Sequence, residues 1–235
     1  MAFVAGRKRV PRPAAGMTAL RARRRMAGVV DSVMSPRLLV MGDNDASTKP
    51  EVNAASREAK RAVRRTLRAA RRARRDMGET SEREADGRRL LRLAEPALRT
   101  ASCVATFEPL DTESNLEPLN ARLLENGRVI VPITLEDLDL SWRDLATGED
   151  LGKDAIALAD VVVAPALAVG ARGERLGQGG GCYDRALPRR REGTPVIAVV
   201  FPDEFGVDFP TQAHDERVDA VLTVNGLTWL REPLR

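Results

Sequence analysis

The chain has 235 residues, of which 43% are hydrophobic and 31% charged, a composition that supports a folded core and excludes a wholly disordered protein. No apolar run approaches the roughly 18 residues of a membrane-spanning helix. Two cysteines and one histidine are too few for a disulfide framework or a Cys/His zinc site, and they indicate a reducing, cytoplasmic setting.

The positive charge of the chain is concentrated in two segments. Residues 1–30 contain eight Lys or Arg and no acid, and residues 57–75 contain ten against Glu58 alone. Subtracting these charges of +8 and +9 from the formal net charge of +4 leaves −13 on the remaining residues. An acidic body therefore carries two cationic segments. Aromatic residues make up only 3% of the chain, which argues against a sheet that stacks nucleic-acid bases.

Residues 1–55 lack a sustained apolar period and are rich in proline and small polar residues, which predicts a basic, mostly disordered extension. Their Arg-rich, acid-poor start also resembles an organelle transit peptide, and an upstream start-site artefact is an equal alternative. The composition favours the disordered extension. We predict one α/β domain over residues 56–235.

Two helices are predicted before the first strand. Ser56 is a candidate N-cap, and apolar residues at 59, 63, 67 and 70 indicate a helix that continues to Arg75. The other faces of this helix are almost entirely arginine. We expect a solvated face to hold Arg65, Arg68, Arg71, Arg72, Arg74 and Arg75. A second helix is predicted from Ser81 to Leu98.

Short apolar runs separated by turn residues predict strands at residues 102–107, 128–132, 160–166, 195–201 and 218–224. Runs such as VVVA and VIAVV lack alternation, as expected for strands that are buried on both faces. A helix is predicted from Asn115 to Asn126, with Gly127 as its C-cap. These elements predict a largely parallel α/β sheet covered by helices.

The segment from Arg175 to Arg185, RLGQGGGCYDR, is the strongest functional signal in the chain. Its glycines let the backbone approach a ligand closely and point several N–H groups at an anion such as phosphate. A helix predicted from Tyr183 to before Pro188 would add a favourable dipole, and Asp184 at its start could hold Mg²⁺. The segment is neither a Walker A loop nor a dinucleotide fingerprint, and a glycine turn without a ligand is the alternative.

This pattern, preceded by APALA at 164–168 and followed by AHD at 213–215 and VDAV at 218–221, resembles the 5-formyltetrahydrofolate cyclo-ligase family. The similarity extends to Lys60 and Arg64, which match the family's Lys-x-x-x-Arg, and to EPLDT at 108–112. It covers roughly residues 57 to 225. The resemblance implies a NagB/RpiA/CoA-transferase-like three-layer α/β sandwich with a largely parallel central sheet and a basic N-terminal helix.

The resemblance implies an enzyme that uses ATP and Mg²⁺ to close 5-formyltetrahydrofolate to 5,10-methenyltetrahydrofolate, with release of ADP and phosphate. Phosphorylation of the formamide oxygen creates a leaving group, and N10 of the folate attacks the activated carbon. Such chemistry requires positioning and charge neutralisation, and no protein nucleophile. We expect a monomer that binds this small-molecule substrate and neither a membrane nor nucleic acid.

The resemblance also implies site residues. Contacts to ATP are expected from Lys60, Arg64, Arg175, Gly177, Gly179, Gly180, Gly181 and Tyr183. Contacts to folate are expected from Glu108, Gln178 and Cys182, and Mg²⁺ ligation from Asp184 and Asp215. No classical acid, base or nucleophile is expected: His214 is interpreted as structural, Cys182 as a small loop residue and Trp142 as a core residue.

The chain departs from the family pattern at Val169, Gly170, Gln178 and Cys182, and its 143–155 connection is short. Nucleotide binding is therefore better supported than efficient turnover. The alternative function is that of a catalytically weakened relative that binds a nucleotide or a polyanion such as RNA. Such a protein would use residues 57–75 and the N-terminal arm.

Overall fold

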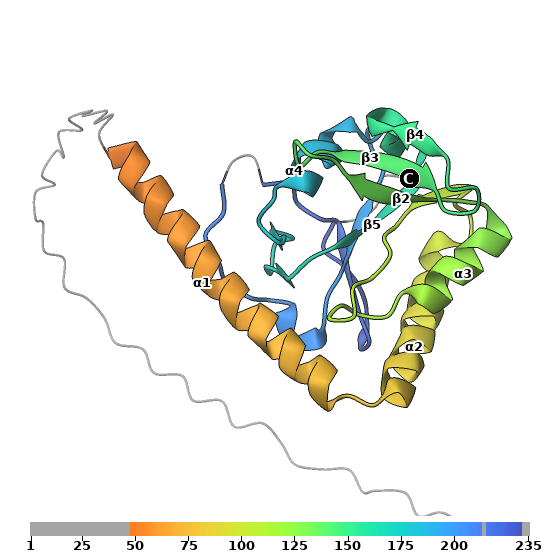
Figure 1. Cartoon of the computed structure of the whole chain (residues 1–235), viewed down its shortest axis with the longest axis horizontal. Helices are drawn as coiled ribbons and strands as arrows, with labels where there is room; N and C mark the ends of the chain where they lie inside the picture. Colours follow the sequence, from red (N-terminus) through yellow and green to blue (C-terminus); the bar gives the residue numbers. More distant parts are fainter. Residues whose placement is uncertain (1–47, 213–214, 232–235) are drawn as a thin grey trace, which may run out of the picture. The chain divides into compact units, whose positions relative to one another are not determined.

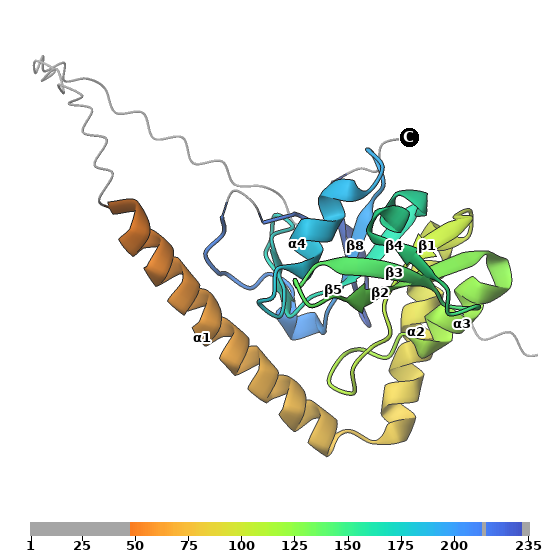
Figure 2. The same ribbon diagram turned by 45° about the horizontal axis from the view of Figure 1, so that its top comes forward.

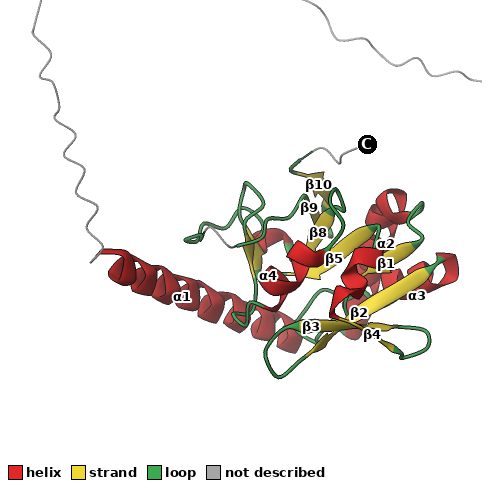
Figure 3. Ribbon diagram, turned by 90° about the horizontal axis from the view of Figure 1, so that it is seen from above, coloured by secondary structure: helices red, strands yellow, loops and turns green. Residues whose placement is uncertain are grey.

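The computed structural model describes residues 48–212 and 215–231, with side chains from residue 54 onward. An eight-stranded sheet forms the centre of this region, in the order β10-β9-β8-β5-β1-β2-β3-β4 (Figures 1 and 3). The strands are β1 (Cys103–Ala105), β2 (Arg128–Thr134), β3 (Leu140–Asp144), β4 (Asp150–Gly152), β5 (Val161–Pro165), β8 (Val196–Val199), β9 (Ala220–Thr223) and β10 (Gly226–Trp229). Neighbours from β9 to β2 pair in parallel, and β3, β4 and β10 add antiparallel edges.

The helices of the described region are α1 (Thr48–Met77), α2 (Thr80–Leu98), α3 (Glu117–Asn126) and α4 (Cys182–Ala186). Short 3₁₀ turns occur at η1 (Lys153–Leu158), η2 (Leu187–Arg189) and η3 (Pro202–Glu204). A separate antiparallel pair, β6 (Ala168–Val169) and β7 (Arg175–Leu176), leads into residues 177–181, which we call the glycine segment. None of the described helices has the length and apolar character needed to cross a membrane.

Successive side chains of a strand point to opposite sides of the sheet, and both sides are covered by other elements. On one face, Val104, Val129 and Val163 pack with leucines of α2 and α3. On the other, Ala105 and Val162 pack with residues of α4, η1 and η2. The two helical layers lie on opposite sides of the sheet (Figure 2). The predicted α/β sandwich with a largely parallel central sheet is confirmed.

The predicted strands and the second and third predicted helices are present, and the edge strands were not predicted. β3 and β4 form a hairpin in which Trp142 pairs with Gly152, so the short 143–155 connection is a tight antiparallel turn. The outer strands β4 and β10 have three and four residues and no unbroken apolar run. β3 is largely buried between β2 and β4, yet its sequence LSWRD also lacks an apolar run. The helix predicted near Tyr183 is a single turn that begins at Cys182, followed by a 3₁₀ turn that contains Pro188.

The first helix begins earlier than predicted. α1 starts at Thr48, so Ser56 lies inside the helix and is not its N-cap, and residues 48–55 do not belong to an extended tail. The missed first turns, TKPEVNAA at 48–55, have no apolar period and contain Pro50, which a helix tolerates in its first turn, and the sequence pattern therefore placed the start too late. The extension predicted for residues 1–47 lies outside the described residues.

Gly127 ends α3 as predicted, but for a different physical reason. Its φ of 177° is extended backbone, not the left-handed conformation of a glycine C-cap. A Cβ atom here would lie 2.5 Å from the carbonyl oxygen of Ser102, which accepts the N–H of Arg128 at the start of β2. The glycine is therefore required for the close approach of α3's end to β1.

We expect Gly127→Ala to lower the free energy of unfolding by about 1–3 kcal/mol, because the backbone of β1 must shift to admit the methyl group. A thermal melt should show a fall of about 2–4 °C in Tm per kcal/mol. Gly226→Ala is the matched control, since no atom lies within 4 Å of a Cβ at that position. Equal Tm values for the two variants would contradict this account.

Candidate active site

A cavity of about 1060 Å³ opens between α1, the ends of β2 and β5, the glycine segment and residues 211, 212 and 215. Every residue for which the sequence predicted a contact to ATP, folate or Mg²⁺ lines this one cavity. These are Lys60, Arg64, Glu108, Arg175, Gly177, Gln178, Gly179, Gly180, Gly181, Cys182, Tyr183, Asp184 and Asp215. Its volume slightly exceeds the range of about 300–1,000 Å³ that is usual for small-molecule sites.

The glycine segment turns sharply on one side of the cavity. Gly179 and Gly181 have φ values of 109° and 70°, a left-handed region that side chains other than glycine rarely adopt. Within the described residues, the backbone N–H groups of 177–181 donate to no partner, while the carbonyl oxygens of Gly177, Gln178 and Gly180 accept hydrogen bonds from arginines. Free N–H groups in a tight turn can bind phosphate oxygens. The dipole of α4 adds little, because that helix is a single turn.

The first helix brings two cations to the glycine segment. Lys60 Nζ lies 2.6 Å from Asp215 Oδ2, and Arg64 Nε donates to the Gly177 carbonyl oxygen at 2.9 Å. The two side chains are one helical turn apart and so share a face. The predicted meeting of α1 with the glycine segment, 113 residues away in sequence from Arg64 to Gly177, is present in the structure.

A buried cluster lies under the glycine segment. Arg175 Nη2 lies 2.8 Å from Asp184 Oδ1, and the guanidinium lies over the Tyr183 ring at 5.4 Å. Tyr183 also meets Trp142 edge to face, and Trp142 is fully buried, as the core interpretation predicted. Burial raises the pKa of the Tyr183 phenol, so this hydroxyl stays protonated and can donate. Arg175 Nε and Tyr183 Oη are both buried without a hydrogen-bond partner in the described chain.

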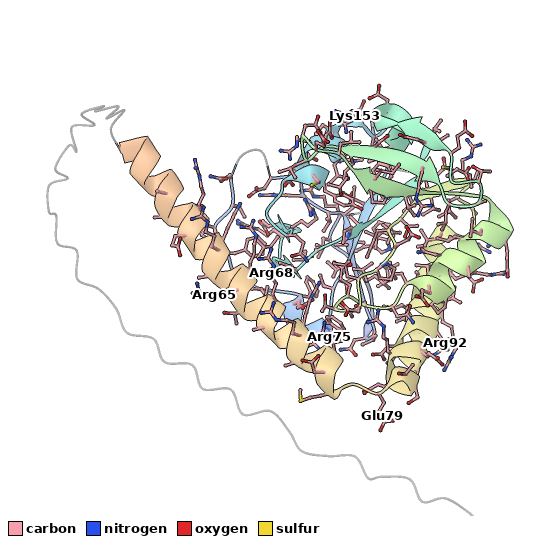
Figure 4. The ribbon with its side chains drawn as sticks, in the orientation of Figure 1. Arg65, Arg68, Arg75, Glu79, Arg92 and Lys153 are labelled. Atoms are coloured by element: carbon pink, nitrogen blue, oxygen red, sulfur yellow. The ribbon has the colours of Figure 1, made fainter. Side chains whose placement is uncertain are left out.

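The expectation of a solvated arginine face is wrong for part of α1. Arg71 is 3% exposed and pairs with Glu204, Arg68 donates to Gln178, and Arg74 donates to Asp203. Figure 4 shows Arg68 on the side of α1 that faces the glycine segment, and Arg65 on the opposite side. A further pair links Arg75 to Asp111. Arg65, Arg72 and Arg75 are exposed, as expected.

Two acids from one loop occupy different places in the cavity. Glu108, the predicted folate contact, is 59% exposed and pairs with Arg143 at the rim. Glu113 was not predicted, and its side chain is only 9% exposed. The sequence signal was a second glutamate shortly before the 115–126 helix, in the same EPLDTES stretch. The buried carboxylate of this loop is therefore Glu113.

Burial raises the pKa of Glu113 above that of an ordinary glutamate. The nearby Glu204 carboxylate acts in the same direction, while the Leu110 N–H, Arg71 and the Gln178 side chain oppose the shift by stabilising the charged form. The largest effect is the loss of hydration on burial.

The acids predicted to hold Mg²⁺ fit that ion only together with a phosphate ligand. Within residues 48–212 and 215–231, no cluster of three His, Cys, Asp or Glu side chains could form a metal site. Asp184 and Asp215 line the same cavity, and Mg²⁺ commonly uses one or two carboxylates plus substrate phosphates and water. Cys182 is half-buried beside them, and His214 lies outside the described residues.

We expect the stability of the protein to depend on the Glu113 charge. Because the folded state binds this proton more tightly than the unfolded chain, stability falls as the pH rises from the ordinary glutamate pKa through the raised value. Glu113→Gln should therefore raise Tm at neutral pH, and the gain should shrink as the pH is lowered. Melting curves across pH test this, with the exposed Glu192→Gln as control. A Glu113→Gln effect that is constant with pH would contradict it.

Comparison with known proteins identifies the family. The model of the 5-formyltetrahydrofolate cyclo-ligase family matches residues 56–224. A curated 5-formyltetrahydrofolate cyclo-ligase of Mycolicibacterium smegmatis is 35% identical over 140 residues, which cover 51% of this chain and 72% of that protein.

Solved structures share the fold. A 5,10-methenyltetrahydrofolate synthetase of Aquifex aeolicus has a TM-score of 0.61 at 22% identity, over 75% of this chain and 95% of its own. The corresponding synthetase of Mycoplasma pneumoniae has a TM-score of 0.59 at 20% identity, over 69% and 97%. With the sequence match over most of the described region, the chain belongs to the 5-formyltetrahydrofolate cyclo-ligase family, whose members are ligases of folate metabolism.

Proposed function

We propose that this protein closes 5-formyltetrahydrofolate to 5,10-methenyltetrahydrofolate in a reaction that depends on ATP and Mg²⁺ and releases ADP and phosphate. One observation carries the proposal: Lys60 and Arg64 of α1, the glycine segment with its open N–H groups, Asp184 and Asp215 all line one cavity. This arrangement combines fixed cations, free backbone donors and two acids, which is what a metal-bound triphosphate requires.

ATP supplies the phosphoryl group that turns the formyl oxygen into a leaving group. The chain supplies charge and position. Lys60 and Arg64 would bind phosphate oxygens from the α1 side, and the N–H groups of 177–181 would bind them from the other side. Arg175 lies buried beneath, where its partnerless Nε and the Tyr183 hydroxyl are donors without an acceptor.

The two acids currently hold two of these cations. Asp215 pairs with Lys60 and Asp184 pairs with Arg175, in a region that is largely shielded from water. In each pair, a cation that we expect to bind phosphate contacts an acid that we expect to bind Mg²⁺. We expect binding of the metal-bound nucleotide to exchange these partners, so that the site stays neutralised with and without ligand.

The folate side of the cavity is lined by Phe107, Pro132 and Leu140, with Glu113 as the buried carboxylate. These apolar side chains suit the flat ring system of a folate, and Glu113 can accept hydrogen bonds from its N–H groups. We assign the folate contact expected of Glu108 to Glu113, because the Glu108 side chain is largely solvated and paired with Arg143. Gln178, within the glycine segment, and Cys182, directly after it, line the same cavity and remain proposed folate contacts.

The alternative, binding of RNA or another polyanion through residues 57–75, finds less support. Arg68, Arg71 and Arg74 hydrogen-bond to residues outside the helix, and Arg64 faces the cavity proposed for ATP, so none of the four lies on an open outer face of α1. The exposed cations of residues 57–75 are Arg57, Arg61, Arg65, Arg72 and Arg75. Exposed charges on a helix are commonly only solvated. An affinity for RNA that survives physiological salt would revive this alternative.

Turnover by the purified protein tests the proposal through the near-ultraviolet absorbance of methenyltetrahydrofolate. We expect product only when ATP, Mg²⁺ and 5-formyltetrahydrofolate are all present. Lys60→Ala and Asp184→Asn should each lower kcat/KM by roughly 10²–10³-fold, because each removes a charge-stabilising contact at the transferring phosphoryl group.

Arg65→Ala is the matched control. It removes a cation from the outer face of the same helix and should change kcat/KM by no more than about twofold. A folded wild-type protein that forms no product under these conditions would refute the proposed function. Equal losses in Lys60→Ala and Arg65→Ala would refute the role of Lys60.

A further inference from the structure

Arg71 is a buried arginine near the C-terminal end of α1, and it is not among the residues assigned to ATP, folate or Mg²⁺. Its guanidinium donates to both carboxylate oxygens of Glu204, at 2.8 and 2.7 Å, and to the Ala166 carbonyl oxygen at 2.6 Å. The remaining nitrogen, Nη1, lies 3.8 Å from Glu113 Oε1 and has no hydrogen-bond partner in the described chain. One side chain thus connects α1, η3, the end of β5 and the loop that carries Glu113.

Stability alone explains this arrangement poorly. Burying two charged groups costs several kcal/mol per ion before their attraction is counted, and an apolar pair of similar volume is often as stable. Arg71 and Glu204 are 3% and 1% exposed. The bidentate geometry holds the guanidinium in one orientation, which an apolar contact would not do.

The described side chains of α1, residues 54–77, contribute to neither apolar core of the sheet. The helix is instead held by its cationic side chains, and Arg71 is the most deeply buried of them. Lys60 and Arg64 lie eleven and seven residues earlier, about 16 and 10 Å along the helix axis. Because a helix is stiff over this length, the position of residue 71 sets where both cations meet the glycine segment.

The same guanidinium lies behind the cavity wall, next to two residues that line it. Glu113 lines that cavity, while Ala166, whose carbonyl Arg71 binds, lines it beside Pro165. Arg71 is the cation closest to the Glu113 carboxylate among the ion pairs of the described residues. Its charge therefore bears on where this carboxylate lies and on how strongly it accepts a hydrogen bond.

We propose that Arg71 is a positioning residue. Its one buried guanidinium fixes the positions of both the phosphate-binding cations of α1 and the folate-facing carboxylate of Glu113. It touches neither substrate and acts through Lys60, Arg64 and Glu113. The inference rests on the proposed function. It predicts that loss of the guanidinium weakens the binding of both substrates together, although they occupy different sides of the cavity.

The test compares two variants with the wild type. Arg71→Lys keeps the charge but cannot reproduce the planar set of donors to Glu204 and Ala166. The double variant Arg71→Met/Glu204→Gln removes both charges at similar size, and it leaves an amide oxygen for the Phe201 N–H that Glu204 now accepts. The neighbouring Arg72→Lys is the matched control, because Arg72 is exposed.

Three quantities are measured: Tm, the calorimetric Kd for ATP without folate, and the KM for each substrate. In Arg71→Lys we expect the Kd for ATP and both KM values to rise about tenfold, with a smaller change in kcat, because binding contacts are displaced in ground and transition state alike. In the double variant we expect a Tm near that of the wild type and the same weakened binding. Arg72→Lys should match the wild type in all three.

A purely structural role for Arg71 would lower Tm and leave the affinities unchanged below the melting range. Wild-type affinity for either substrate in folded Arg71→Lys would therefore overturn the proposal. If the double variant does not fold, Arg71→Lys alone decides the question. Failure of the proposed function appears differently, because the wild type itself would then form no methenyltetrahydrofolate.

Discussion

The attraction between the cationic face of α1 and the polar groups of the sheet domain is the constraint on which the site depends. The described part of this helix contributes nothing to either apolar core, so its place is set by Lys60 on Asp215, Arg64 on the Gly177 carbonyl and Arg71 on Glu204. Salt weakens exposed contacts of this kind, whereas buried ones are screened far less. The buried pair of Arg71 and Glu204 is therefore the attachment of α1 that salt weakens least.

This mode of attachment explains why a large cavity lies beside α1. A helix that packs through an apolar stripe closes on its neighbour, because leucine-sized side chains exclude the space between them. Long cationic side chains instead reach partners at a distance and end in charged groups. The same residues that hold the helix in place are thus available to bind anions, and the proposed phosphate site and the attachment of α1 share Lys60 and Arg64.

The loop between β1 and α3 shows how burial changes the role of a residue type. Glu108 and Glu113 are five residues apart in sequence, yet one is exposed and paired at the rim while the other is buried against Arg71 and Gln178. Only the buried carboxylate offers an acceptor that water does not already satisfy. Glu113 is therefore the proposed folate contact, whereas Glu108 forms a surface ion pair with Arg143.

Local pattern in the sequence was sufficient for the central strands, α2, α3 and the glycine segment, because unbroken apolar runs and glycines with special backbone angles leave a direct mark on composition. The resemblance motifs likewise predicted that Lys60, Arg64, Arg175 and the two aspartates serve one site, and all five line one cavity. Tertiary structure alone decided which arginines of α1 are buried, since residues 65 and 71 look alike until the partner of each is known. It also decided the start of α1, the edge strands and the choice of Glu113 over Glu108. In each case the deciding quantity was contact with residues far away in the chain, which local periodicity does not record.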